Sequence, residues 1–124
     1  AGIATEAVLR LGHVPTTVKT RIVADRQQVV RVDWEKHVQF QARHLADFSR
    51  RLDRALAGVT AVVIEDYSKG VVQQPVVDAL LAAARRKKIP VGLDPKDNYD
   101  LQVDGITLAK PNRKEAFAHA GIKD

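Results

Sequence analysis

Three short apolar segments in the second half of the chain constrain its fold most strongly. They cover residues 61–64, 89–93 and 106–109, and polar, turn-forming residues follow each of them. A helical pattern opening at Pro75 separates the first two segments, and a basic run over 85–88 suits the C-terminal end of that helix. This alternation predicts right-handed strand–helix–strand crossovers and a parallel sheet, so we expect an α/β fold. Because the first segment is entirely apolar, we expect that strand to be buried on both faces.

The first half of the chain combines a strand pattern with a helical pattern. Over residues 16–34 apolar side chains alternate with charged ones, and residues 25–26 fit a turn, which predicts a β-ribbon. Periodicity alone leaves open whether the charged face of this ribbon lines a site or faces water. From 36 to 57 the period becomes helical, and Gly58 is expected to end that helix. A further short helix is expected over 113–120.

Composition and charge exclude several classes of protein. The chain has 124 residues, 45% of them hydrophobic, and no cysteine, which is typical of one globular domain without disulfides or thiolate–metal sites. No apolar stretch approaches the roughly 18 residues needed to span a bilayer. Aromatic residues make up only 5%, too few for a platform on which RNA bases stack. The formal net charge of +5 fits an anionic small-molecule substrate as well as a nucleic acid.

Two further groups of residues have a simple structural interpretation. Arg50, Arg51 and Arg54 share a segment with Asp47, and the i,i+4 spacing of Asp47 and Arg51 favours a solvated helix face over a nucleic-acid surface. The four histidines lack the spacing of metal ligands, so we do not expect a histidine–metal site. The sequence contains no Walker-type loop, dinucleotide fingerprint or nucleophile elbow.

Polar residues follow all three predicted strands. They are Asp66 with Lys69, Asp94 with Lys96, and Asn112 with Glu115. Because ligands bind at the carboxyl ends of parallel strands, we expect these residues to share one edge of the sheet. Lysines beside carboxylates suit a phosphorylated substrate and a metal-bound nucleotide. The spacing of Asn112 and Glu115 fits a helix capping box equally well, so that pair has two interpretations.

Four motifs give the sequence a specific resemblance. The strings PTTVKTR (15–21) and QQVVRVD (27–33) come first, EDYSKGV (65–71) contains a DYxKG element, and DPK (94–96) and the NxxE pattern (112–115) follow. In this order and spacing they resemble the PfkB/ribokinase-type sugar kinases. More narrowly, they resemble the D-glycero-D-manno-heptose 7-phosphate kinases, which are free-standing or form the kinase half of bifunctional ADP-heptose synthases. The resemblance extends over essentially the whole chain.

The resemblance implies roles for individual residues. Arg31 and Lys69 would pair with the sugar phosphate. Asp66 would contact a sugar hydroxyl, and Lys96 would support the phosphate end of the crevice. The ATP phosphates would be contacted by Asn112, Arg113, Lys114 and Glu115. Glu115 would also orient water around Mg²⁺. Such positioning and such cation clamps are what phosphoryl transfer requires.

The resemblance also implies that residues 1–124 are the central fragment of a ribokinase-like kinase domain, with the ribbon over 16–34 and a βαβ sheet region over 36–124. The family's amino-terminal glycine pair and its DTxGAGD segment, which carries the catalytic base, have no counterpart here. We therefore expect no catalytic residue in the fragment and no turnover from it alone. The complete cytoplasmic enzyme would use ATP and Mg²⁺ to convert heptose 7-phosphate to the 1,7-bisphosphate, for ADP-heptose and lipopolysaccharide core synthesis.

The expected partners are a sugar phosphate and ATP, without a membrane or a nucleic acid. An uncovered edge of a parallel sheet invites pairing, so we also expect a homo-oligomer. Two alternatives stay open. One is another PfkB-type kinase acting on a fructose phosphate or a nucleoside, against which the two strings of the ribbon argue. The other is a non-catalytic module that binds phosphate or nucleic acid.

Overall fold

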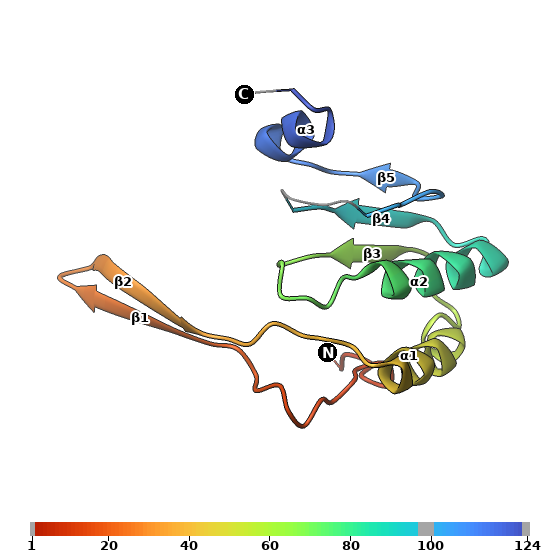
Figure 1. Ribbon diagram of the computed structural model, residues 1–124, viewed down its shortest axis with the longest axis horizontal. Helices are drawn as coiled ribbons and strands as arrows, with labels where there is room; N and C mark the ends of the chain where they lie inside the picture. Colours follow the sequence, from red (N-terminus) through yellow and green to blue (C-terminus); the bar gives the residue numbers. More distant parts are fainter. Residues whose placement is uncertain (1, 97–100, 123–124) are drawn as a thin grey trace.

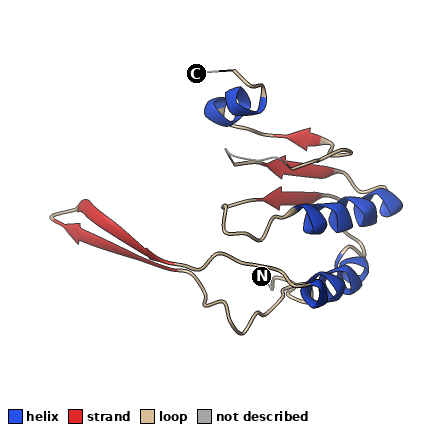
Figure 2. Cartoon of the chain, viewed as in Figure 1, coloured by secondary structure: helices blue, strands red, loops and turns tan. Residues whose placement is uncertain are grey.

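The chain forms a three-stranded parallel sheet with three helices and a separate two-stranded antiparallel ribbon (Figures 1 and 2). The computed structural model describes residues 2–96 and 101–122. Its elements in chain order are β1 (Val18–Ala24), β2 (Gln27–Trp34), α1 (Ala42–Ala55), β3 (Val62–Glu65), α2 (Gln74–Lys87), β4 (Val91–Asp94), β5 (Leu108–Ala109) and α3 (Arg113–His119). The sheet has the order β3-β4-β5 and is parallel throughout, which confirms the predicted α/β class. Among the described residues, no helix has the length and apolar character needed to cross a bilayer.

The three-stranded sheet and the three helices together are here called the body. The ribbon, which consists of β1 and β2, projects away from the body (Figure 1). Asp25 and Arg26 connect the two strands, and their φ angles of 45° and 70° are the left-handed values that a type I′ hairpin turn requires. Every ribbon residue except Asp33 is exposed. Strand pairing therefore maintains this element without a core of its own, and the ribbon predicted over 16–34 is confirmed.

The core of the body lies between the sheet and α2. It is formed by six buried side chains, from β3, α2 and β4: Ile64, Val77, Leu81, Ala84, Val91 and Leu93. A second cluster joins α1 to α2 through Leu52, Leu56 and Ala83. The apolar face of α2 thus fixes the position of the strands whose ends carry the predicted site.

The helix predicted from residue 36 begins only at Ala42. The preceding segment has no regular structure, because backbone groups of Val38 form hydrogen bonds with the residues that follow β3. The Val38 amide donates to the Lys69 carbonyl over 2.8 Å, and Gln73 Nε2 donates to the Val38 carbonyl over 3.1 Å. Val38 is buried, as its apolar character suggested, but through these tertiary contacts and not on a helix face.

The prediction that the first strand is buried on both faces is wrong. Ile64 of β3 is 6% exposed, whereas its neighbour Val63 is 72% exposed. Successive side chains of a strand point to opposite faces, and α2 covers only the face that carries Ile64. In the part of the chain that the structure describes, the opposite face of the sheet has no helix packed on it, and Leu108 of β5 is exposed as well.

Candidate functional site

The carboxyl ends of β3, β4 and β5 open onto a pocket of about 220 Å³, here called the strand-end pocket. Figure 1 shows these three strand ends on the side of the body from which the ribbon projects. The lining includes six polar residues that end these strands or follow them: Asp66, Asp94, Lys96, Lys110, Asn112 and Glu115. The three polar groups that the sequence placed at one edge of the sheet therefore lie together, although Lys69 belongs to the neighbouring pocket described below.

Two carboxylates of the strand-end pocket are buried. Asp66 is 7% exposed and Glu115 is 4% exposed. Ser68 Oγ donates to Asp66 Oδ2 over a long 3.4 Å. A buried carboxylate needs hydrogen bonds or a cation to compensate its lost hydration, and one long bond supplies little of this. The Asp66 carboxylate is therefore suited to accept a hydrogen bond from a ligand hydroxyl.

Asn112 and Glu115 form a complete capping box at the start of α3. Asn112 Oδ1 accepts from the Glu115 amide over 2.9 Å, and Glu115 Oε2 accepts from the Asn112 amide over 2.8 Å. The capping interpretation is therefore confirmed. Because the cap engages only Oε2 of the carboxylate, it is compatible with a ligand at the other oxygen, and the nucleotide role stays a prediction.

The donor set of the strand-end pocket fits hydrated magnesium better than a tightly ligated ion. Within residues 2–96 and 101–122, no group of three or more histidine, cysteine, aspartate or glutamate side chains could hold a metal. Mg²⁺ keeps several waters and is usually bound through one or two carboxylates together with substrate phosphates. Glu115 and Asp94, which line the same pocket, could hold it in this way.

A second pocket of about 550 Å³ lies where the ribbon meets the body, and we call it the ribbon pocket. Its lining includes Arg31 from β2, Lys69 from the loop after β3, and Lys96 from the loop after β4. Glu65, Asp66, Tyr67 and Lys96 line both pockets, so the two pockets are adjacent. All four residues predicted to bind the sugar phosphate thus line one pocket, and so do Lys19, Arg31 and Asp33 of the charged ribbon face.

Ion pairs hold the cations of the ribbon pocket. Asp33 accepts from Arg31 Nε (2.8 Å) and Nη2 (3.0 Å) and from Lys19 Nζ (2.9 Å). The hydrogen bond from Arg31, followed by that from Lys19, lowers the pKa of the Asp33 carboxyl below its ordinary value, and the same contact raises the pKa of Arg31. Lys69 Nζ pairs with the carboxylate of Glu35. Each of the two cations predicted to bind phosphate is therefore held by a carboxylate.

Arg113 and Lys114 are the two predicted nucleotide-binding residues that lie between Asn112 and Glu115 on α3. Neither is among the residues that line the two pockets. The Arg113 guanidinium lies 5.3 Å from the centroid of the Phe117 ring, one turn further along α3. Their contacts to ATP phosphates stay a prediction.

Sequence reasoning assigned no role to five charged residues at or beside these pockets, and one of them is Glu65, which ends β3 and lines both pockets. Lys110 Nζ lies 3.4 Å from Asp94 Oδ2. The sequence could have indicated Lys110 as a site residue, because it directly follows the third strand. Lys19 and Asp33 stood on the charged ribbon face, but their pairing with Arg31 depends on strand register. No local pattern marks Glu35 as the partner of Lys69.

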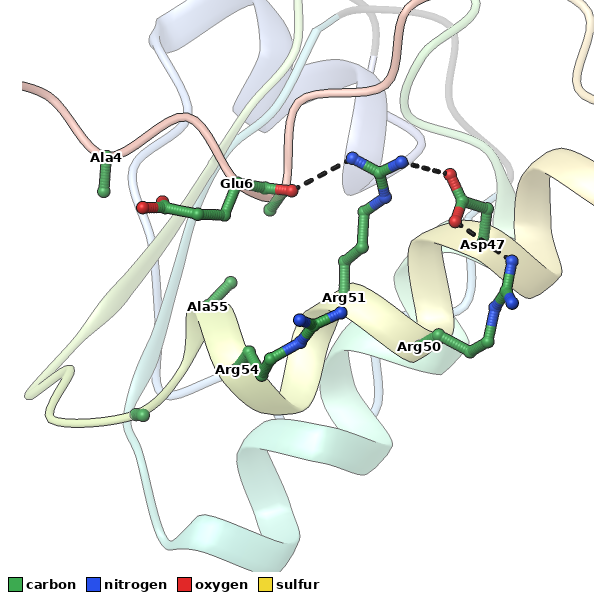
Figure 3. Close-up of a pocket in the computed structure, with 9 residues that line it drawn as sticks. Ala4, Glu6, Asp47, Arg50, Arg51, Arg54 and Ala55 are labelled. Atoms are coloured by element: carbon green, nitrogen blue, oxygen red, sulfur yellow. Dashed lines mark hydrogen bonds and ion pairs between the residues drawn. The ribbon is translucent and has the colours of Figure 1, made fainter.

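A further hollow, of about 760 Å³, is lined by the N-terminal segment and by α1 and the residues that follow it (Figure 3). Asp47 pairs with Arg51 at 2.8 Å and with Arg50 at 3.1 Å, which confirms the predicted i,i+4 contact. The bond from Arg51 lowers the pKa of Asp47. Arg51 Nη1 also donates to the Glu6 carbonyl over 3.1 Å. Arg50 and Arg51 therefore form ion pairs and a hydrogen bond with residues of the same chain, in agreement with the interpretation as a solvated helix face.

Comparison with known proteins gives the chain its relatives, although no protein-family model matches it. It is 40% identical over 121 residues to the bifunctional protein HldE of Pelobacter propionicus, which is 98% of this chain and 25% of that protein. It is also 40% identical over 114 residues to the D-beta-D-heptose 7-phosphate kinase of Bordetella bronchiseptica, 92% of this chain and 35% of the kinase. The resemblance to the heptose 7-phosphate kinases is confirmed.

The chain spans about a quarter of the bifunctional relatives and about a third of the kinase. HldE of Geobacter metallireducens shows the same proportion, with 41% identity over 86% of this chain and 22% of that protein. Nearly the whole chain matches both a kinase and the bifunctional proteins. It therefore corresponds to a fragment of the kinase domain that these relatives share.

Proposed function

We propose that the chain forms the sugar-phosphate wall and part of the ATP wall of an ATP-dependent heptose 7-phosphate kinase of the PfkB type. The observation that supports this proposal is that the two pockets are adjacent and share Asp66 and Lys96 in their lining. One pocket is lined by cations suited to a phosphate, and the other by carboxylates and a helix start suited to a hydrated metal and a nucleotide. The names of the relatives support heptose 7-phosphate as the sugar.

In the sugar end of this site, Arg31 and Lys69 pair with the 7-phosphate and Asp66 accepts from a sugar hydroxyl. Arg31 is 45% exposed and Lys69 37% exposed, so both keep donors available to a ligand. Charge-assisted bonds of this kind are the strong ones in phosphate recognition. Lys96, which lines both pockets, lies where the two substrates would approach each other.

In the nucleotide end, residues 112–115 contact the ATP phosphates and Glu115 orients water around Mg²⁺. The metal would neutralise charge on the transferred group. The sugar hydroxyl oxygen forms a bond to the γ-phosphorus, the bond to the ADP oxygen breaks, and the hydroxyl proton passes to a base outside these residues. The product is the 1,7-bisphosphate, an intermediate for ADP-heptose and lipopolysaccharide core synthesis.

A substrate panel tests this proposal on the full-length protein that carries these residues. ADP release with Mg-ATP should be fast with heptose 7-phosphate and near background with fructose 6-phosphate or adenosine. Preference for either of the latter would replace the proposed substrate. The 124-residue chain alone should stay at background, and turnover by it would mean that these residues contain the base.

A further inference from the structure

Lys19 is a cation of the ribbon pocket whose role is still open. It lies on β1 directly opposite Asp33 of β2, and Arg31 stands two residues before Asp33 on the same face of the ribbon. Residues with this spacing project to one side of a strand pair. Lys19, Arg31 and Asp33 all line the ribbon pocket.

Asp33 holds the two cations in a defined geometry. It accepts from the Nε and Nη2 groups of Arg31, which is one edge of the guanidinium, and leaves the Nη1 group free of this contact. It accepts one bond from the Lys19 ammonium, which has three donors. Each cation therefore keeps donors for a second anion while its side chain is held in place.

We propose that Lys19 is a third cation that contacts the sugar phosphate, and that Asp33 is the positioning residue that sets Lys19 beside Arg31. The inference rests on the proposed function, because it adds to the recognition of the same phosphate. A phosphate dianion has more acceptor sites than Arg31 and Lys69 fill, and a tightly spaced pair of cations matches it better than either alone.

If Asp33 acted only through its negative charge, its removal would strengthen phosphate binding, whereas a positioning role predicts weaker binding. An experiment can therefore distinguish the two roles. Lys19, Arg31 and Asp33 together carry one net positive charge, since two cations share one carboxylate. The lowered pKa of Asp33 keeps it ionised at neutral pH. Removing its charge raises the local positive potential, which by itself would tighten phosphate binding. Loss of positioning weakens it instead.

The test uses steady-state kinetics of the full-length protein with heptose 7-phosphate and Mg-ATP. Lys19→Ala and Asp33→Asn should each raise KM for the sugar phosphate about tenfold, the loss expected for one charge-assisted contact, with kcat and KM for ATP unchanged. Arg21→Ala is the matched control. Arg21 lies two residues from Lys19 on the same strand, opposite Arg31, and carries the same charge, but it does not line the ribbon pocket.

The double variant of Lys19→Ala and Asp33→Asn should be little worse than either single variant, because both remove the same arrangement. Lys19→Arg should restore most of the affinity, which excludes a folding defect. The inference is overturned if Lys19→Ala behaves like Arg21→Ala, or if Asp33→Asn lowers KM. Lys69→Ala serves as the reference. If it also leaves KM unchanged, the proposed function itself fails, and if it alone raises KM, only the inference about Lys19 fails.

Discussion

The ribbon and the body are stabilised in different ways. In the body, Val77 and Val91 are almost completely buried, and α2 covers one face of the sheet. In the ribbon, even Trp34 is 67% exposed, so strand pairing, the turn and the Lys19–Asp33 ion pair have to maintain the structure. The comparison shows that the ribbon contributes surface and charge, whereas the body contributes rigidity.

The same difference divides the candidate site. The body supplies buried carboxylates, Asp66 and Glu115, at fixed positions beyond the strands. The ribbon supplies exposed cations, Lys19 and Arg31, on an element without a core. Burial makes a carboxylate sensitive to its partners, whereas exposed cations can change partners at little cost in stability. A phosphorylated ligand would therefore complete a site that neither region forms alone.

The largest expected difference between the regions is in stability. Leu81→Ala removes a buried side chain from the body and should lower the free energy of unfolding by about 2–5 kcal/mol. Ile22→Ala, on the ribbon, should change it by less than about 0.5 kcal/mol, because Ile22 is half exposed. Urea unfolding of the two variants measures both values. A loss above 1 kcal/mol for Ile22→Ala would mean that the apolar face of the ribbon is packed in solution, against this comparison.

A smaller effect is expected at the junction of the regions. Gly70 and Gly58 both have left-handed φ angles, +80° and +73°. A Cβ at Gly58 meets nothing, so Gly58→Ala should cost about 1–2 kcal/mol from backbone strain alone. At Gly70 it would collide with the Val38 carbonyl and the His37 ring, in the segment that leads from the ribbon to the body.

Gly70→Ala should therefore destabilise the protein more than Gly58→Ala, and it should also weaken sugar-phosphate binding, because Gly70 follows Lys69 in the same loop. Thermal unfolding and substrate titration of both variants check this. Equal melting temperatures and equal affinities of the two variants would contradict this, and would mean that the segment around Val38 can move to accommodate a Cβ at Gly70.

The smallest effect separates the two roles of Glu115. Glu115→Gln keeps a capping group, since glutamine also serves at this position of a capping box, but it removes the charge. Glu115→Gln should keep the free energy of unfolding within about 0.5 kcal/mol of the wild-type value, while it lowers kcat and raises the Mg²⁺ concentration needed for activity. Glu115→Ala should also lose about 1 kcal/mol of stability. Wild-type kinetic constants in Glu115→Gln would show that Glu115 only caps the helix and has no role in catalysis.

The fold could be predicted where the information is local. The alternation over 16–34 and the turn at 25–26 predict the two strands of the ribbon, although not the register shift between Ile22 and Val23, and the three apolar segments predict the strands of the sheet. Two predictions failed because they depend on contacts distant in sequence. Val38 is buried by the loop around Lys69 and not on a helix, and Val63 is exposed because α2 covers only one face of β3.

The site followed the same rule. Parallel strands bring their carboxyl ends to one edge, so Asp66, Lys96 and Glu115 could be placed together from their positions after predicted strands. The position of Arg31 beside them came only from the resemblance, because nothing in the ribbon's own sequence fixes where it lies against the body. The pairing of Lys69 with Glu35 joins two loops, and no sequence pattern indicates it.

The central claim is that ribbon and body bind one phosphate together, and calorimetric titration of the full-length protein with heptose 7-phosphate tests it most directly. Arg31→Ala on the ribbon and Lys69→Ala on the body should each weaken binding about ten- to a hundredfold, the loss of one charge-assisted contact, while affinity for ATP stays the same. Arg21→Ala should bind like the wild type. Unchanged affinity in both Arg31→Ala and Lys69→Ala, or a loss as large in Arg21→Ala, would contradict the account.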